Sequence, residues 1–138
     1  MRIVFKKGRH NPKLRGKLYS FFCSLSALTL LRFNQSSRYK LNPIDQYDWN
    51  KLYGRRNFAW GENRKEEMWV WRYNVAEKTF EVAKYFREGD DISWKEVKQV
   101  RDNEIIYLDN DWFTLPLLTG SYFGGNNPAP SPIKYVLK

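Results

Sequence analysis

Apolar and polar positions alternate most clearly over residues 68–75 (MWVWRYNV). Trp69 and Trp71 fall on one face of this segment and Val70 on the other, as the period of two in a β-strand requires. Aromatic and β-branched residues suit a half-buried pleated surface, so we expect Trp71 to be buried. A short polar turn then leads into a second apolar segment, 79–86, and the pair predicts a β-hairpin.

Other short apolar segments bounded by turn residues extend this pattern along the chain. Strands are predicted at 2–6, 18–23, 27–33, 105–108, 112–118, 120–123 and 133–137. Residues 92–101 fit either a strand or a helix, because Ser93 and Glu96 can form a capping box at the start of a helix. Strand is preferred, since short strands separated by turn residues are predicted on both sides. Together these segments predict an all-β fold, an antiparallel β-sandwich of jelly-roll-like type, as one domain over residues 1–138.

Composition removes several classes of site. Hydrophobic residues make up 42% of the chain and aromatic residues 17%, which is too much apolar surface for a disordered coil. The single cysteine, Cys23, has no internal disulfide partner and favours a reducing, cytoplasmic compartment. With one cysteine and one histidine, His10, a Cys/His zinc site is excluded and a histidine-based catalytic triad is disfavoured. We therefore expect a protein that is not an enzyme and uses no metal or cofactor.

The charge of the chain is concentrated in its first third. Residues 1–44 contain ten basic and no acidic side chains, whereas residues 45–138 contain fourteen basic and fifteen acidic ones, so +10 and −1 give the net +9. The ten are Arg2, Lys6, Lys7, Arg9, Lys13, Arg15, Lys17, Arg32, Arg38 and Lys40. This asymmetry predicts an anionic partner: nucleic acid, a nucleotide-like phosphorylated ligand or an acidic protein. The apolar stretch 18–31 is too short to span a membrane, so no membrane partner is expected.

Two basic residues outside this first third lie near aromatic ones. Arg55 and Arg56 precede Trp60, and a guanidinium can pair with phosphate while an aromatic ring stacks on a base. The candidate ligand-binding residues are Arg55, Arg56, Trp60, Lys6, Lys7, Arg9, Lys13 and Arg15. Gly124, Gly125 and Asn126 form a candidate binding loop, although the segment lacks the Lys-Ser/Thr ending of a phosphate loop and also suits a shaped connection before the last strand.

These observations predict a non-catalytic binding protein for an anionic partner. Two alternatives stay open. A carbohydrate-binding module would display exposed tryptophans, for which Trp69 and Trp71 are candidates, whereas a structural or protein-interaction protein would dock its basic segment on an acidic partner. The oligomeric state is not indicated by the sequence.

Three short motifs carry a resemblance to a known family. The stretches WNKLYG (49–54), WRY (71–73) and YFGGN (122–126) resemble a family of small proteins of Bacteroidota and of their phages and mobile elements. The resemblance implies an all-β sandwich without an established activity, and a phage-encoded role on a host or defence component in the host cytoplasm. The family's histidine after the first motif is absent from 55–61 (RRNFAWG), and its closing histidine is Ser131 here, so no role of those histidines carries over.

Overall fold

The computed structural model describes residues 1–110 and 115–138. Its strands are β1 (Arg2–Phe5), β2 (Leu28–Phe33), β3 (Asn50–Arg56), β4 (Lys65–Asn74), β5 (Thr79–Glu88), β6 (Asp91–Val100), β7 (Ile105–Asp109), β8 (Leu117–Thr119) and β9 (Ile133–Leu137). One α-helix, α1 (Leu14–Phe22), and short 3₁₀ turns at Cys23–Leu25, Gln35–Ser37 and Gly61–Asn63 complete the part of the chain that is described. No helix in this part is long and apolar enough to cross a membrane.

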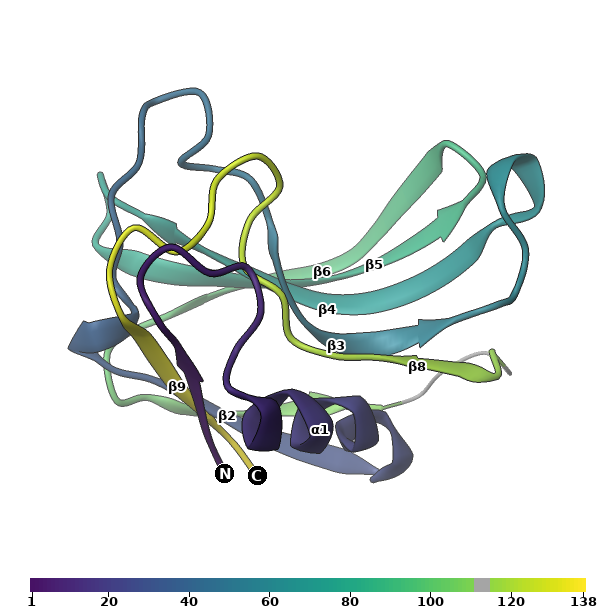
Figure 1. Cartoon of the computed structure of the whole chain (residues 1–138), viewed down its shortest axis with the longest axis horizontal. Coiled ribbons are helices and arrows are strands. Elements are labelled where there is room, and N and C mark those ends of the chain that lie inside the picture. The colour runs from purple at the N-terminus through teal and green to yellow at the C-terminus, as the bar shows by residue number, and fades with distance from the viewer. Residues whose placement is uncertain (111–114) are drawn as a thin grey trace.

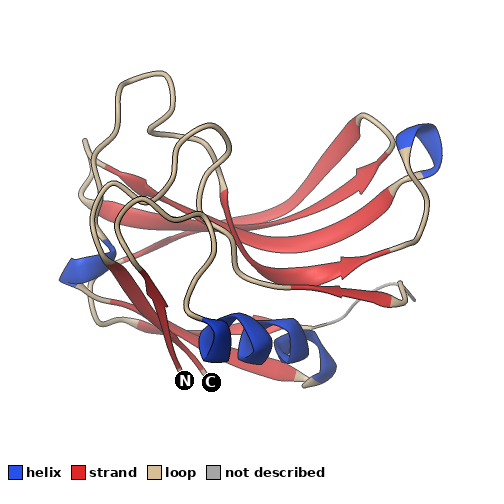
Figure 2. Ribbon diagram, viewed as in Figure 1, coloured by secondary structure: helices blue, strands red, loops and turns tan. Residues whose placement is uncertain are grey.

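The strands form two antiparallel sheets that pack against each other (Figure 1, Figure 2). Sheet A has the order β1-β9-β2-β7 and sheet B the order β6-β5-β4-β3-β8. The predicted β-sandwich is therefore confirmed, including the hairpin of β4 and β5 and the preference for strand over 92–101. The last strand lies between β1 and β2, which brings the two chain termini side by side (Figure 1).

The prediction of a strand at 18–23 is wrong, because residues 18–22 belong to α1 and Cys23 begins the 3₁₀ turn that follows. The helix turns its small residues inward: Gly16 and Ser20 are buried, while Leu18 and Phe22 are exposed. A β-carbon on Gly16 would lie 3.3 Å from the Cδ1 atom of Ile3, so the helix and β1 approach closely at this glycine. A run of apolar residues does not reveal this arrangement, since the inward face carries the less hydrophobic side chains.

Two other predicted strands are shorter than expected. Residues 120–123 make only an isolated bridge, in which Tyr122 pairs with Lys51, because the chain turns away at Gly124 with a positive φ of 72°. Within the segment predicted at 112–118, the strand β8 begins only at Leu117, and residues 112–114 lie outside the described residues.

Aromatic rings fill the space between the sheets. Trp71 is fully buried, and its ring centroid lies 4.8 Å from that of Phe33 and 5.6 Å from that of Tyr135. Trp69 is also buried, and its indole nitrogen donates a hydrogen bond of 2.9 Å to the carbonyl of Asp109. The predicted burial of Trp71 is confirmed, and neither tryptophan is available as a platform for a sugar ring.

The other face of sheet B is turned away from sheet A and is concave (Figure 1). We call it the concave face. The strand registers place on it Lys51, Gly54 and Arg56 of β3; Glu66, Met68, Val70 and Arg72 of β4; Glu81, Ala83, Tyr85 and Arg87 of β5; and Ile92, Trp94 and Val97 of β6.

Glu66 is a buried carboxylate on the concave face. Its side chain accepts hydrogen bonds from the Tyr85 hydroxyl and, at 2.6 Å, from Arg64, and the Lys51 ammonium is 3.9 Å away. Burial acts to raise the pKa of this carboxyl, but the Tyr85 hydrogen bond and the two cations together lower it below its ordinary value of 4.5.

The variant Glu66→Gln should therefore be less stable than the wild type by about 1–3 kcal/mol at neutral pH. A lowered carboxyl pKa contributes stability that is present above pH 4.5 and is lost as the pH falls through the folded-state pKa, so the difference should shrink in acid. Urea denaturation at pH 7 and at about pH 3.5 measures it. The exposed Glu77→Gln is the control, and an equal loss at both pH values would contradict the assignment.

Candidate anion-binding site

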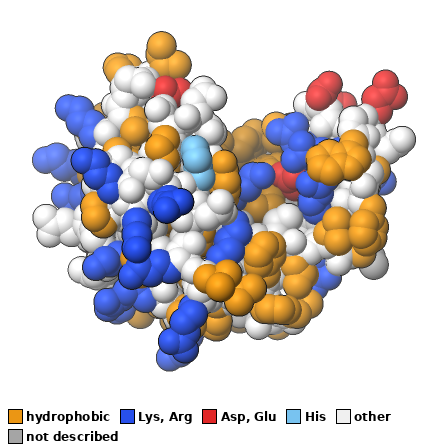
Figure 3. Space-filling model, in the orientation of Figure 1, with side chains coloured by type: hydrophobic (Ala, Val, Ile, Leu, Met, Phe, Trp, Pro, Cys, Tyr) orange, Lys and Arg blue, Asp and Glu red, His pale blue; other side chains and the backbone are white. Residues whose placement is uncertain are grey.

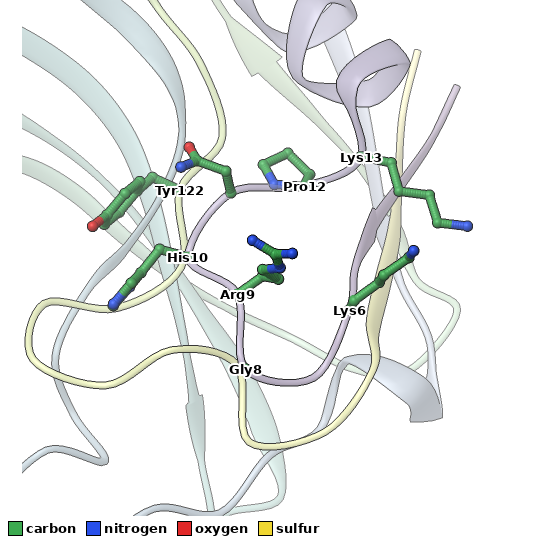
Figure 4. A pocket seen from close by; sticks show the side chains of 8 residues that line it. Lys6, Gly8, Arg9, His10, Pro12, Lys13 and Tyr122 are labelled. Atoms are coloured by element: carbon green, nitrogen blue, oxygen red, sulfur yellow. The ribbon is translucent and has the colours of Figure 1, made fainter.

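A pocket of about 490 Å³ lies between the β1–α1 loop and Tyr122 (Figure 4). It is lined by Lys6, Gly8, Arg9, His10, Asn11, Pro12, Lys13 and Tyr122, and we call it the basic pocket. Three of the basic residues expected to bind a ligand, Lys6, Arg9 and Lys13, are thus brought together by one loop.

Backbone hydrogen bonds to the C-terminal segment hold this loop in place. Gly8 donates to the carbonyl of Ala129 at 2.8 Å, and Ala129 donates to the carbonyl of Arg9 at 3.0 Å. Phe123 donates to the carbonyl of His10 at 2.7 Å. Gly8 has a positive φ of 83°, which glycine adopts without steric cost. The loop is therefore fixed before any ligand arrives, which reduces the entropy lost on binding.

One wall of the basic pocket is a pair of stacked rings. The rings of His10 and Tyr122 have centroids 5.0 Å apart and planes within 7° of each other. The Nδ1 atom of His10 lies 2.7 Å from the carbonyl oxygen of Phe123. A carbonyl can only accept, so Nδ1 carries a proton and Nε2 is left for another partner.

Lys17 packs against the same wall from α1. Its ammonium lies 5.6 Å from the centre of the Tyr122 ring and donates a hydrogen bond of 2.5 Å to the carbonyl of Ser121. Burial lowers the pKa of Lys17 to about 8, and the nearby Lys51 adds to the effect. Tyr122 therefore lies in a locally positive region.

The cations of the pocket are not neutralised by the part of the fold that the structure describes. Among residues 1–110 and 115–138, Lys6, Arg9 and Lys13 have no carboxylate within 4.0 Å. Of the ten basic residues in the first 44, Arg38 has an ion pair in that described part, with Asp102 at 2.7 Å, and the other nine have none. Figure 3 shows Lys and Arg side chains gathered on the side of the molecule that carries this loop.

Two further predicted residues flank the pocket. Lys7 and Arg15 are exposed, and Arg15 lines a neighbouring hollow of about 440 Å³ that shares Lys13 with the basic pocket and adds Arg2. The described residues that line either hollow include no carboxylate. The two hollows therefore form one continuous positive surface around Lys13.

Arg55 and Arg56 do not form a joint site, because adjacent residues of β3 point to opposite faces of sheet B. Arg55 points between the sheets and donates to the carbonyls of Leu115 and Ser24 at 3.3 and 3.4 Å, so it stabilises the fold. Arg56 is on the concave face, with its guanidinium 4.6 Å from the centre of the Trp60 ring. Trp60 is exposed at 75% of its surface and remains accessible to a ligand.

The glycine loop adjoins the basic pocket but has a different electrostatic character. The Gly124 N–H donates to the side chain of Asn50 at 2.6 Å, and Asn126 and Asn127 donate to the carboxylate of Asp45. A β-carbon on Gly124 would lie 2.2 Å from the carbonyl oxygen of Asn127. The polar groups of this loop are used in hydrogen bonds that fix its shape. The Asp45 carboxylate lies beside them, so the loop is an unfavourable place for an anion.

Sequence reasoning missed His10 and Tyr122 as parts of the site. A signal was available for His10, which lies within the basic segment between Arg9 and Lys13. Tyr122 is more than a hundred residues away along the chain and carried no such signal.

Comparisons with protein-family models, curated protein sequences and solved structures find no match to this chain. The resemblance to the family from Bacteroidota and their phages stays a prediction. The function is therefore inferred from the geometry of the site.

Proposed function

We propose that the protein binds the phosphate groups of nucleic acid at the basic pocket, as a binding protein without a catalytic step. The observation that carries the proposal is a set of cations, Lys6, Arg9 and Lys13, that have no ion pair among the described residues and are held around one pre-formed pocket. An Arg guanidinium can donate to two phosphate oxygens at once, and Lys supplies a point charge on a flexible stem.

Charge beyond the pocket supports a polymer over a single small anion. Arg2, Lys7 and Arg15 surround the pocket on the same positive surface, so several phosphates along one chain have partners. A field of this sign also attracts a polyanion from a distance and increases its association rate. The alternative of a sugar platform loses its two sequence candidates, since Trp69 and Trp71 are in the core.

The test is a salt titration of binding to a labelled single-stranded oligonucleotide, followed by fluorescence anisotropy. Each phosphate neutralised on a single strand contributes about −0.7 to the slope of log K against log salt, so three to five contacts predict a slope of about −2 to −3.5. Duplex of the same sequence, a mononucleotide and inorganic phosphate are compared to separate polymer from free-phosphate binding. No binding to any of these at about 50 mM salt, or binding that ignores salt, would overturn the proposal.

A further inference from the structure

Aromatic rings and one guanidinium form an unbroken series of contacts across the concave face. The centroids of Trp49 and Trp94 lie 5.1 Å apart, and those of Trp94 and Tyr85 lie 5.6 Å apart. The guanidinium carbon of Arg72 lies 4.0 Å from the centre of the Trp49 ring and 5.5 Å from the centre of the Tyr47 ring, so the series extends from Trp49 through Arg72 to Tyr47. The series includes residues of β4, β5 and β6 together with the segment that leads into β3.

Trp94 is the member of this series whose ring is held by neighbouring rings and is also exposed to solvent. Contacts with Trp49 and Tyr85 hold its ring, yet the residue is 45% exposed. Met68, Val70 and Ala83 beneath the series are already buried. A large aromatic surface left in water on a concave face is costly, and such surfaces commonly mark binding sites.

The same face carries an excess of positive charge. Lys51, Arg56, Arg64, Arg72 and Arg87 lie on or beside it, whereas the acidic residues described there are Glu66 and Glu81. Glu81 is paired with Arg72 at 2.8 Å, and Glu66 is shared by Arg64 and Lys51. Arg56 and Arg87 have no ion pair in the described part of the chain. The excess favours an anionic ligand over a neutral sugar.

The concave face is continuous with the basic pocket through Tyr122. Tyr122 lines the pocket and is also paired with Lys51, through backbone hydrogen bonds of 2.8 and 3.0 Å. The strand registers pair Lys51 with Val70, Val70 with Ala83, and Ala83 with Val97. A row of paired residues therefore runs from Tyr122 across sheet B to Val97, beside Trp94. Four strand spacings of about 4.8 Å give a path of about 19 Å. At roughly 3.4 Å per phosphate, this path accommodates about five to six nucleotides of a stacked single strand. Figure 3 shows the surface hollowed between the part with the β1–α1 loop and the far ends of the sheet B strands.

We infer that the concave face binds the bases of a single-stranded nucleic acid whose phosphates lie in the basic pocket, with Trp94 as a stacking platform. This inference rests on the proposed function and adds to it the selection of single strands, since the bases of a duplex are not free to stack on a side chain. Base stacking on an aromatic ring tolerates any sequence, so the site binds single strands without strong sequence preference.

The experiment compares Trp94→Ala with the matched control Tyr107→Ala, which removes an exposed aromatic ring from β7 of sheet A, away from the concave face. Trp94→Ala should weaken binding of a single-stranded oligonucleotide by about 5- to 150-fold, which corresponds to 1–3 kcal/mol for one stacked base. Tyr107→Ala should change it less than about 2-fold. An oligonucleotide with abasic sites throughout should bind wild type and Trp94→Ala equally, and the salt slope should be the same for both.

Two further variants keep the test decisive if the smaller side chain disturbs the sheet. Trp94→Leu keeps an apolar cover over Tyr85 without an aromatic ring and should bind as weakly as Trp94→Ala. Trp94→Phe should recover most of the wild-type affinity. Circular dichroism and thermal denaturation check the fold of each variant.

Three outcomes would overturn the inference, and each leads to a different conclusion about the protein. Equal binding by Trp94→Ala and Tyr107→Ala, with salt-dependent binding retained, would remove the base platform and leave the proposed function standing. Binding of a neutral glucose oligomer that depends on Trp94, without an effect on nucleic acid, would assign the face to sugars. No binding of the wild type to any nucleic acid at low salt would remove the inference together with the proposed function.

Discussion

Replacing Trp71 with alanine is expected to lower the free energy of unfolding by about 3–5 kcal/mol. Trp71 is fully buried, and its ring contacts Phe33 and Tyr135 of sheet A and Tyr39 of the loop that leads to β3, so its loss leaves a cavity at the centre of the sandwich. Because the surrounding rings belong to separate strands and loops, they cannot all move into the space that the indole leaves. Guanidinium chloride denaturation followed by circular dichroism measures the change.

Two other variants distinguish burial from the mere loss of a tryptophan. Trp71→Phe keeps an aromatic ring in the cavity and should cost less than Trp71→Ala. Trp60→Ala removes an exposed tryptophan and should change the free energy of unfolding by no more than about 0.5 kcal/mol. A loss below about 1 kcal/mol for Trp71→Ala would contradict the central position of this residue.

The triple variant Lys6→Gln, Arg9→Gln, Lys13→Gln should have the largest effect on binding. The three side chains line one pocket and have no ion pair within the described residues, so their removal leaves no buried charge unpaired. Losing three phosphate contacts on a single strand reduces the salt slope by about 2 and the affinity at about 50 mM salt by about 100-fold or more. Anisotropy titrations of wild type and variant with the same oligonucleotide measure both quantities.

The matched control removes the same charge elsewhere. Arg32→Gln, Lys40→Gln and Lys138→Gln together also lower the net charge by three, at exposed positions that do not line the basic pocket. This control should weaken binding only modestly, because it reduces the long-range field without removing contacts. If the two triple variants behave alike, net charge alone accounts for binding and the pocket has no special part in it.

Local sequence patterns predict the parts of the fold that depend on neighbouring residues. Alternation over 68–75 was enough to predict the hairpin and the burial of Trp71, because the period of two assigns side chains to faces without knowledge of the partner strand. The ten cations without an acid among them also predicted a positive surface, and the structure adds that only Arg38, among the described residues, meets a carboxylate.

Which residues come into contact depends on how the elements pack, and local patterns do not reveal it. The helix α1 escaped prediction because Gly16 and Ser20, not the larger apolar residues, face inward, and that choice depends on how closely β1 and the helix approach. Arg55 and Arg56 are separated by the pleat of β3, a strand whose existence was not predicted from its mixed residues.

The two sites depend most on contacts distant in sequence. Tyr122 reaches His10 because the C-terminal segment hydrogen-bonds to the β1–α1 loop, and Trp94 reaches Trp49 because β4 and β5 place them on one face. The register irregularities near Leu52 and between Lys84 and Tyr85 then fix which side chains point to that face. Local patterns set the faces of single strands, whereas pairing and bulges between strands set which faces and loops come together.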